Sequence, residues 1–131
     1  MIDPAKYVGR KYDLATYNCV HLVSEIWMDA FSVDLLMRPP APFTLLKAVR
    51  GVAQWERDLR PQVLEQVDTP DGVCLVIVNR KSEPLPHCGV SFDGKLLHIN
   101  KPGIVRLDPL PPPPEDGTMR YFHGRSWLSL V

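Results

Sequence analysis

The sequence has no excess charge of either sign and no long apolar run. Lysine and arginine together number 15, as do aspartate and glutamate, and the basic residues are scattered. Because nucleic-acid binding normally needs a basic stripe, this balance argues against a nucleic-acid partner. No segment approaches the roughly 20 apolar residues of a membrane span, and the first residues lack the apolar run of a secretory signal. We therefore expect synthesis in the cytoplasm and no membrane span.

Cysteine is also scarce, since the chain has three, an odd number with no CxxC spacing. This count argues against a disulfide framework. Cys74 and Cys88 fall in segments expected to be strands, where a buried reduced thiol is ordinary. Cys19 differs because it falls at the start of a predicted helix. The chain shows no internal repeat, and its 131 residues suit one domain over residues 1–131.

Helical patterns come first along the chain. Asn18 is expected to cap a helix over about Cys19 to Phe31, in which apolar residues recur at helical spacing. A second helix is predicted from about Thr44, after a rigid proline-rich connector over Met37–Pro42. The apolar side of this second helix is expected to comprise Leu45, Leu46, Val49, Val52 and Ala53.

Strand patterns follow the helices. The predicted strands are Val73–Val78, Cys88–Phe92, Lys95–Asn100, Ile104–Leu107, Met119–His123 and Trp127–Val131. The proline run within Leu110–Gly117 predicts an extended, solvated crossing between late strands. Helices followed by strands indicate the α+β class, with N-terminal helices packed on an antiparallel β-sheet.

Two of these strands flank Asp93-Gly94, a dipeptide typical of a two-residue hairpin turn. That loop length fixes the register, so Gly89 is expected opposite His98 and His87 opposite Asn100. His87 and His98 then lie on one face as diagonal neighbours, roughly 7–8 Å apart, and Gly89 leaves room for the His98 ring. Ser91, Leu96 and Asn100 share that face. The other face carries Cys88, Val90, Phe92, Leu97 and Ile99.

A thiol at a helix N-terminus and a pair of histidines are the groups that nucleophilic cysteine chemistry needs. The helix dipole and the free N–H groups of the first turn favour a Cys19 thiolate and can stabilise an oxyanion. His87 is the expected general base. Its second ring nitrogen needs a partner that keeps the base in the right tautomer, and both His98 and Asn100 fit that position.

Other residues near the thiol have more than one interpretation. His21 lies two positions after Cys19, roughly 200° around the helix, so a solvent or packing role is expected. Tyr12 and Tyr17 precede the thiol, and either hydroxyl fits the core or the reacting carbonyl. A zinc site made by Cys19, His87 and His98 is an alternative, but the chain lacks the short paired ligand spacing usual in such sites. We expect no metal.

These motifs resemble the NlpC family of bacterial and phage cell-wall cysteine endopeptidases, which are small papain-like domains. The resemblance covers residues about 5 to 100. It lies, in order, in Gly9-Arg10-Lys11-Tyr12, Tyr17-Asn18-Cys19-Val20-His21-Leu22-Val23, Asp71-Gly72-Val73, His87-Cys88-Gly89-Val90-Ser91 and Asp93-Gly94-Lys95-Leu96-Leu97-His98.

The chain also departs from the family pattern. Asn18-Cys19-Val20-His21 stands where Asp-Cys-Ser-Gly is usual, Lys11 where proline is common, and Cys88 where valine is usual. The stretch from Asn18 to Val23 is also similar to the Asn-Cys-Glu-His-Phe-Val motif of the lecithin retinol acyltransferase-like branch of the same superfamily. In that branch the histidines precede the cysteine. The order found here favours the hydrolases.

The resemblance implies a papain-like domain in which Cys19 is the nucleophile, His87 the general base and His98 its orienting partner, with Asn100 as the rival. It implies that Tyr12 helps to hold the oxyanion, and that peptide bonds of peptidoglycan stem peptides are hydrolysed without a metal or cofactor. The chain is also similar to cell-wall hydrolase modules of tailed phages. We therefore expect a location in the virion tail, action at the bacterial cell wall, and tail-tip proteins as partners.

Two other functions remain open. One is a structural or assembly module of a phage tail tip whose site has decayed, since Val20 and His21 are bulkier than the usual residues. The other is acyl transfer to a lipid or amine, in which water would resolve the thioester poorly.

Overall fold

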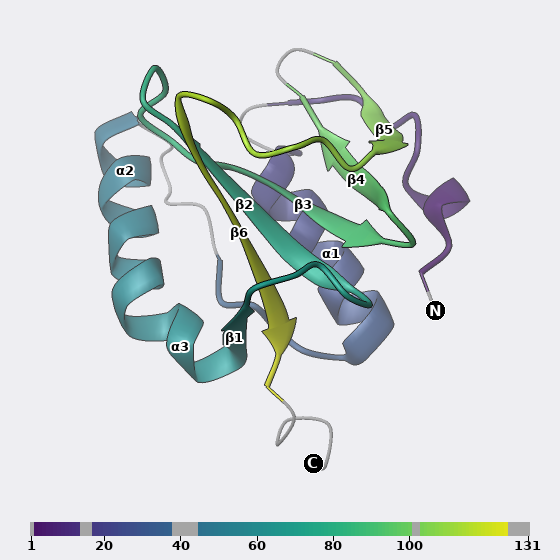
Figure 1. Ribbon diagram of the computed structural model, residues 1–131, viewed down its shortest axis with the longest axis horizontal. Helices are drawn as coiled ribbons and strands as arrows, with labels where there is room; N and C mark the ends of the chain where they lie inside the picture. The colour runs from purple at the N-terminus through teal and green to yellow at the C-terminus, as the bar shows by residue number, and fades with distance from the viewer. Residues whose placement is uncertain (1, 14–16, 38–44, 101–102, 126–131) are drawn as a thin grey trace.

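The computed structural model describes residues 2–13, 17–37, 45–100 and 103–125. The helical elements are the 3-10 helix η1 (Pro4–Lys6), α1 (Cys19–Phe31), α2 (Leu45–Gln54), the π-helix η2 (Trp55–Leu59) and α3 (Arg60–Val63). The strands are β1 (Leu64–Val67), β2 (Cys74–Arg80), β3 (His87–Phe92), β4 (Lys95–Ile99), β5 (Val105–Pro109) and β6 (Gly117–Gly124). They pair antiparallel in the order β1-β6-β2-β3-β4-β5 (Figure 1). The predicted α+β class with an antiparallel sheet is confirmed.

Helix α1 covers one face of the sheet and lies behind it in Figure 1. Its buried side chains pack against alternate residues of the central strands, and burial of this apolar surface holds the helix in place. The main contributors to this core are Leu22, Val23, Ile26 and Trp27 from α1 and Leu75, Ile77, Cys88, Val90, Leu97, Ile99 and Phe122 from the sheet.

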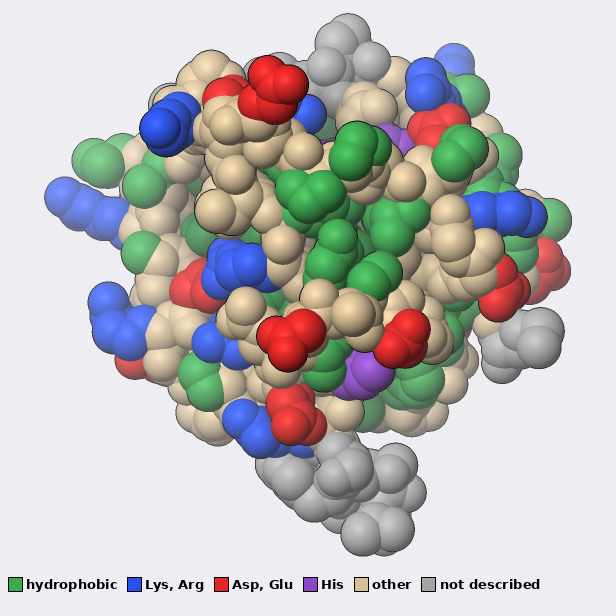
Figure 2. All heavy atoms as spheres, viewed as in Figure 1, with side chains coloured by type: hydrophobic (Ala, Val, Ile, Leu, Met, Phe, Trp, Pro, Cys, Tyr) green, Lys and Arg blue, Asp and Glu red, His purple; other side chains and the backbone are tan. Residues whose placement is uncertain are grey.

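The opposite face of the sheet carries a smaller apolar cluster of Val76, Val78 and Leu96, against which Leu110, Met119 and Tyr121 pack. The segment between β5 and β6 crosses this face, as the prolines predict (Figure 1). Figure 2 shows hydrophobic side chains gathered near the middle of the face. Because side chains alternate along a strand, His87 and His98 belong to this face and Cys88 to the face under α1.

Helix α1 begins as the sequence predicts. Asn18 has an extended backbone, and its side-chain oxygen accepts hydrogen bonds from the N–H groups of Val20 and His21. The His21 ring in turn accepts from the Asn18 N–H at 3.1 Å, which completes a capping box. His21 therefore has a capping role that its spacing did not predict. The cap fixes Cys19 as the first residue of the helix.

The hairpin of β3 and β4 agrees with the prediction from Gly89 to His98, but β4 ends at Ile99, so the predicted pairing of His87 with Asn100 does not form. Asp93 and Gly94 have φ values of 52° and 72°, the left-handed conformation that a type I′ turn needs. The register pairs Gly89 with His98 and Phe92 with Lys95. The two histidines are therefore diagonal neighbours on one face.

Other predictions were wrong or lie outside the described residues. Strand β1 was missed, because only its first residue, Leu64, is fully buried in a short edge strand with a polar middle. Leu46 and Ala53, expected on the apolar side of the second helix, are exposed, Leu46 at 60%, whereas Ala48 on the same helix is buried. The predicted strand Trp127–Val131, Thr44 and the prolines of the connector lie outside the described residues. Within the described part of the chain, no helix is long and apolar enough to cross a membrane.

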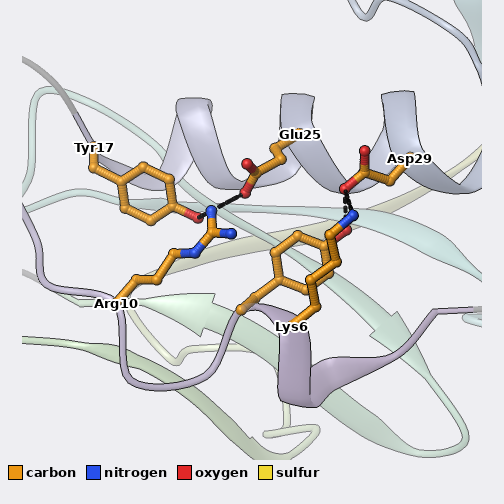
Figure 3. A network of polar contacts seen from close by, with 6 residues as sticks. Lys6, Arg10, Tyr17, Glu25 and Asp29 are labelled. Atoms are coloured by element: carbon orange, nitrogen blue, oxygen red, sulfur yellow. Dashed lines mark hydrogen bonds and ion pairs between the residues drawn. The ribbon is translucent and has the colours of Figure 1, made fainter.

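Polar contacts tie the N-terminal segment to α1 (Figure 3). Lys6 forms an ion pair with Asp29 at 2.8 Å, and Arg10 forms one with Glu25. The Tyr17 hydroxyl donates to the same Glu25 carboxylate at 3.1 Å. These contacts hold the segment that precedes the helix against one side of α1. The Tyr17 hydroxyl is part of this network, because it contacts Arg10 of the N-terminal segment and Glu25 of α1.

Candidate active site

Cys19 is the first residue of α1, and its sulfur lies against the side chains of Cys88 and His87 on β3. The Cys88 thiol donates a hydrogen bond to the Cys19 sulfur, and this bond is the largest cause that lowers the pKa of Cys19 well below its usual value. Burial acts in the opposite direction, and the hydrogen bond and charge of His87 add to the lowering. The arrangement favours a thiolate at Cys19.

Cys88 was predicted to be an ordinary buried thiol, and that prediction is incomplete. Its side chain is 4% exposed and faces α1, where its pKa is raised well above the usual value by the neighbouring Cys19 and by burial. Cys88 therefore keeps its proton and can donate it in a hydrogen bond. The sequence could not indicate this contact, because it depends on which face of the hairpin the helix covers.

The His87 ring contacts the ring of His98, the residue predicted to orient it. Nε2 of His87 lies 3.2 Å from Nδ1 of His98, and the rings meet edge to face with centroids 5.4 Å apart. Since Nε2 of His87 faces His98, Nδ1 is the ring nitrogen that is left to exchange a proton with Cys19. Asn100, the rival partner, is exposed and lines the cleft beside these residues.

Asp108 on β5 extends this pair of histidines. Its Oδ2 atom lies 2.8 Å from Nε2 of His98 and also accepts hydrogen bonds from Arg106, at 3.2 Å from Nε and 3.0 Å from Nη2. The hydrogen bond from His98 is the largest cause that lowers the pKa of Asp108. Burial is the largest cause that lowers the pKa of His98, so its neutral form is favoured at neutral pH.

Asp108 was missed from the sequence, because the predicted strand ended at Leu107 and the observed strand extends to Pro109. The one signal was an alternating pattern, Arg106-Leu107-Asp108, next to a histidine-bearing strand. Using that signal required the β4–β5 register, which pairs His98 with Arg106.

Tyr12 lies beside the thiol, on the N-terminal segment. Its backbone N–H donates to the Gly103 carbonyl at 2.8 Å, which fixes the segment next to the start of β5. Burial is the largest cause that raises the pKa of Tyr12, and the negative charge of Cys19 raises it further. The phenol therefore keeps its proton and remains a hydrogen-bond donor near the thiolate.

The first-turn N–H groups, expected to be free to stabilise a charge at the thiol, are partly occupied by the helix cap. Asn18 accepts from the N–H groups of Val20 and His21. The backbone N–H of Cys19 itself is the first-turn donor that the cap does not use.

The thiol and both histidines line a cleft of about 860 Å³, a volume typical of ligand sites. Cys88, Ile77 and Arg120 form a row across β3, β2 and β6 on the face under α1, and all three line the cleft. Arg120 donates to Glu56 and to Asn79, each at 3.0 Å. Further lining residues are Ala48, Val52 and Trp55 from α2 and η2, and Pro111, Pro112 and Pro114 after β5. The lining of the cleft is therefore largely apolar and includes one ion pair, between Arg120 and Glu56.

No group of three or more His, Cys, Asp or Glu side chains among the described residues is arranged to hold a metal ion. Comparison with protein-family models, curated proteins and solved structures gives no match. The fold and the site together define an α+β domain with a cysteine at the start of a helix. Beside it, His87, His98 and Asp108 contact one another across three neighbouring strands.

Proposed function

We propose that this protein is a thiol-dependent hydrolase that cleaves amide bonds. The observation that carries the proposal is the contact of the Cys19 sulfur with His87, whose other ring nitrogen contacts His98. A nucleophile, a base that touches it and a third group that orients the base are the parts that such chemistry requires. His21 supports the proposal too, because its departure from the NlpC pattern has a structural reason in the capping box.

The proposed substrate is the stem peptide of peptidoglycan, and this choice rests on the resemblance of the motif residues to the NlpC family. The cleft is compatible with it in size, because its volume of about 860 Å³ lies in the range of sites that hold small ligands. Delivery to the cell wall by a phage tail rests on the same resemblance and belongs to the proposal.

In the proposed mechanism, Nδ1 of His87 takes the proton of Cys19 and the thiolate attacks the amide carbonyl carbon. The Cys19 N–H and the Tyr12 hydroxyl stabilise the oxyanion of the tetrahedral intermediate. His87 then returns the proton to the leaving amine, and the C–N bond breaks to leave a thioester on Cys19. Water, deprotonated by His87, hydrolyses this thioester and regenerates the thiol.

Digestion of purified sacculi by the wild-type chain and by Cys19→Ala tests the proposal. We expect new amino termini, identified by mass spectrometry, with the wild type and none with the variant. The pair of fragments also identifies the bond that is cut. An intact Cys19→Ala fold, checked by circular dichroism, makes the comparison valid. No cleavage by the wild type would favour a structural module, and equal cleavage by both would exclude a thiol mechanism.

A further inference from the structure

His87, His98 and Asp108 form a diagonal line across three neighbouring strands. His98 pairs with Gly89 on β3 and with Arg106 on β5, so His87 and Asp108 lie at its two diagonal positions. The contacts along this line are 3.2 Å between the rings and 2.8 Å from His98 to the carboxylate. The line therefore has a carboxylate at one end and the Cys19 thiol at the other.

The carboxylate determines the direction of every hydrogen bond along the line. Ionised Asp108 can only accept, so Nε2 of His98 must carry the proton. A neutral His98 then has a lone pair on Nδ1, and Nε2 of His87 must donate to it. A neutral His87 with its proton on Nε2 has its lone pair on Nδ1, the nitrogen left to serve Cys19.

We propose that Asp108 is a positioning residue that sets the tautomers of both histidines, so that the basic nitrogen of His87 faces the Cys19 thiol. The catalytic use of these tautomers rests on the proposed function, but the tautomers themselves do not depend on any substrate. When His87 takes up the thiol proton, its Nε2–H still donates to His98. No hydrogen bond between His87, His98 and Asp108 therefore has to exchange its donor and acceptor during the reaction.

Arg106 provides a matched control. It donates to the same oxygen of Asp108, but its side chain is 58% exposed and lies outside the line of the rings. If Asp108 served only this surface ion pair, then Arg106→Ala and Asp108→Ala would remove the same interaction and have the same effect. If Asp108 sets the tautomers, Asp108→Ala should change them and Arg106→Ala should not.

Long-range ¹H–¹⁵N spectra of the ¹⁵N-labelled chain at pH 8 read the tautomers directly. Measured in a Cys19→Ala background, which prevents an ion pair with His87, the spectra should show the Nε2–H tautomer for both rings. Arg106→Ala should keep this state, and Asp108→Ala should give a mixture of tautomers. Two results would overturn the proposal. One is an Nδ1–H tautomer at His87 in the single variant Cys19→Ala. The other is unchanged tautomers after Asp108→Ala is added to that background and the protein still folds.

The rate of iodoacetamide alkylation of Cys19 at pH 7 links the tautomers to reactivity. We expect Asp108→Ala to slow it at least threefold and Arg106→Ala to leave it within a factor of two. Equal effects of the two variants would overturn the positioning role. Because neither measurement uses peptidoglycan, a failure of the proposed substrate would leave these results unaffected.

Discussion

At the scale of single residues, Cys19 and Cys74 show how neighbours decide the chemistry of a thiol. Burial raises the pKa of Cys74, which is the ordinary behaviour of a thiol in a protein interior. Cys19 is partly buried too, but its pKa is lowered by the Cys88 thiol and by His87. The difference is that the neighbours of Cys19, among them the charge of His87, outweigh the effect of burial, whereas at Cys74 burial is the largest cause.

Replacing Cys88 by alanine removes the first of these donors. The pKa of Cys19 should rise, and the midpoint of its alkylation against pH should move up by about one pH unit, an effect of ~1.4 kcal/mol, because a hydrogen bond to a charged group contributes about that much. The rate of iodoacetamide alkylation against pH measures the change. Cys88→Ser should restore the donor, and Cys74→Ala, at a buried cysteine of the opposite sheet face, is the matched control. An unchanged alkylation profile in Cys88→Ala would show that the contact does not stabilise the thiolate.

His98 and Asn100 are distinguished by measuring their alanine variants side by side. His98→Ala should lower the rate of the proposed hydrolysis by on the order of 10²-fold or more, because His87 would lose the partner that sets its tautomer and its direction. Asn100→Ala should have a small effect, because His98 makes the contact with the His87 ring. Release of amino termini from muropeptides measures both rates. Damage from the Asn100 change alone would assign the orienting role to that residue instead.

The sequence predicted the residues of the site that belong to local patterns. Cys19 follows a capping residue, and His87 and His98 are related by a turn whose register is determined by its length. Asp108 and Cys88 were missed because their contacts depend on long-range choices. Asp108 requires the β4–β5 register, and Cys88 requires knowledge of the sheet face that α1 covers.

At the scale of elements, Gly89 controls how closely β3 and β4 approach at the site. A Cβ atom at this position would lie 2.9 Å from the Leu97 carbonyl oxygen and 3.0 Å from Cβ of His98. The first distance is shorter than real Cβ atoms show and the second is tighter than most, so the strand that carries His98 would have to move. Gly89 thus gives the His98 ring the room that the sequence predicted, and it does so through sterics and not through its backbone angles.

Gly89→Ala should therefore lower the free energy of unfolding by about 1–3 kcal/mol, as overpacking in a core typically does. It should also slow the alkylation of Cys19, because His98 would be displaced. Gly51→Ala is the matched control, since a Cβ atom there meets nothing within 4 Å on helix α2 and alanine favours a helix by about 1 kcal/mol. Urea unfolding measures both variants. A Gly89→Ala protein with wild-type stability would show that β4 adapts without cost.

Elements with a strong local pattern were predicted better than elements that depend on their neighbours. Helix α1 and the β3–β4 hairpin carry caps, turns and regular spacing, and both agree with the structure. Strand β1 is held by its pairing with β6, from Leu64 opposite Gly124 to Val67 opposite Tyr121. Its own four residues have too little apolar pattern to indicate a strand.

At the scale of the whole molecule, the lowered pKa of the partly buried His98 should make stability depend on pH. Its pKa is lowered in the folded chain mainly by burial, so the unfolded chain binds this proton more readily. The stability that results is complete above the unfolded pKa, about 6.5, and is lost as the pH falls toward the lower folded pKa. Asp108, whose pKa is also lowered, adds a loss at still lower pH.

Urea unfolding at pH 7.5, 6.5 and 5.5 should therefore show a falling free energy of unfolding. His98→Asn should reduce the size of this fall, whatever its effect at pH 7.5. Some fall should remain, because the pKa values of His21 and of Cys19 are also lowered in the folded chain. A pH dependence identical in the variant and the wild type would show that His98 does not stay neutral in the folded chain.

The central claim is that folding places a reactive thiolate at Cys19 beside the His87 imidazole. The most direct measurement is the rate of iodoacetamide alkylation against pH for the wild type and for His87→Ala, with the labelled peptide identified by mass spectrometry. We predict labelling of Cys19 with a midpoint well below the roughly 8.5 of a free cysteine, and a higher midpoint in His87→Ala. A midpoint near that of free cysteine in both proteins, or faster labelling of another cysteine, would contradict the claim.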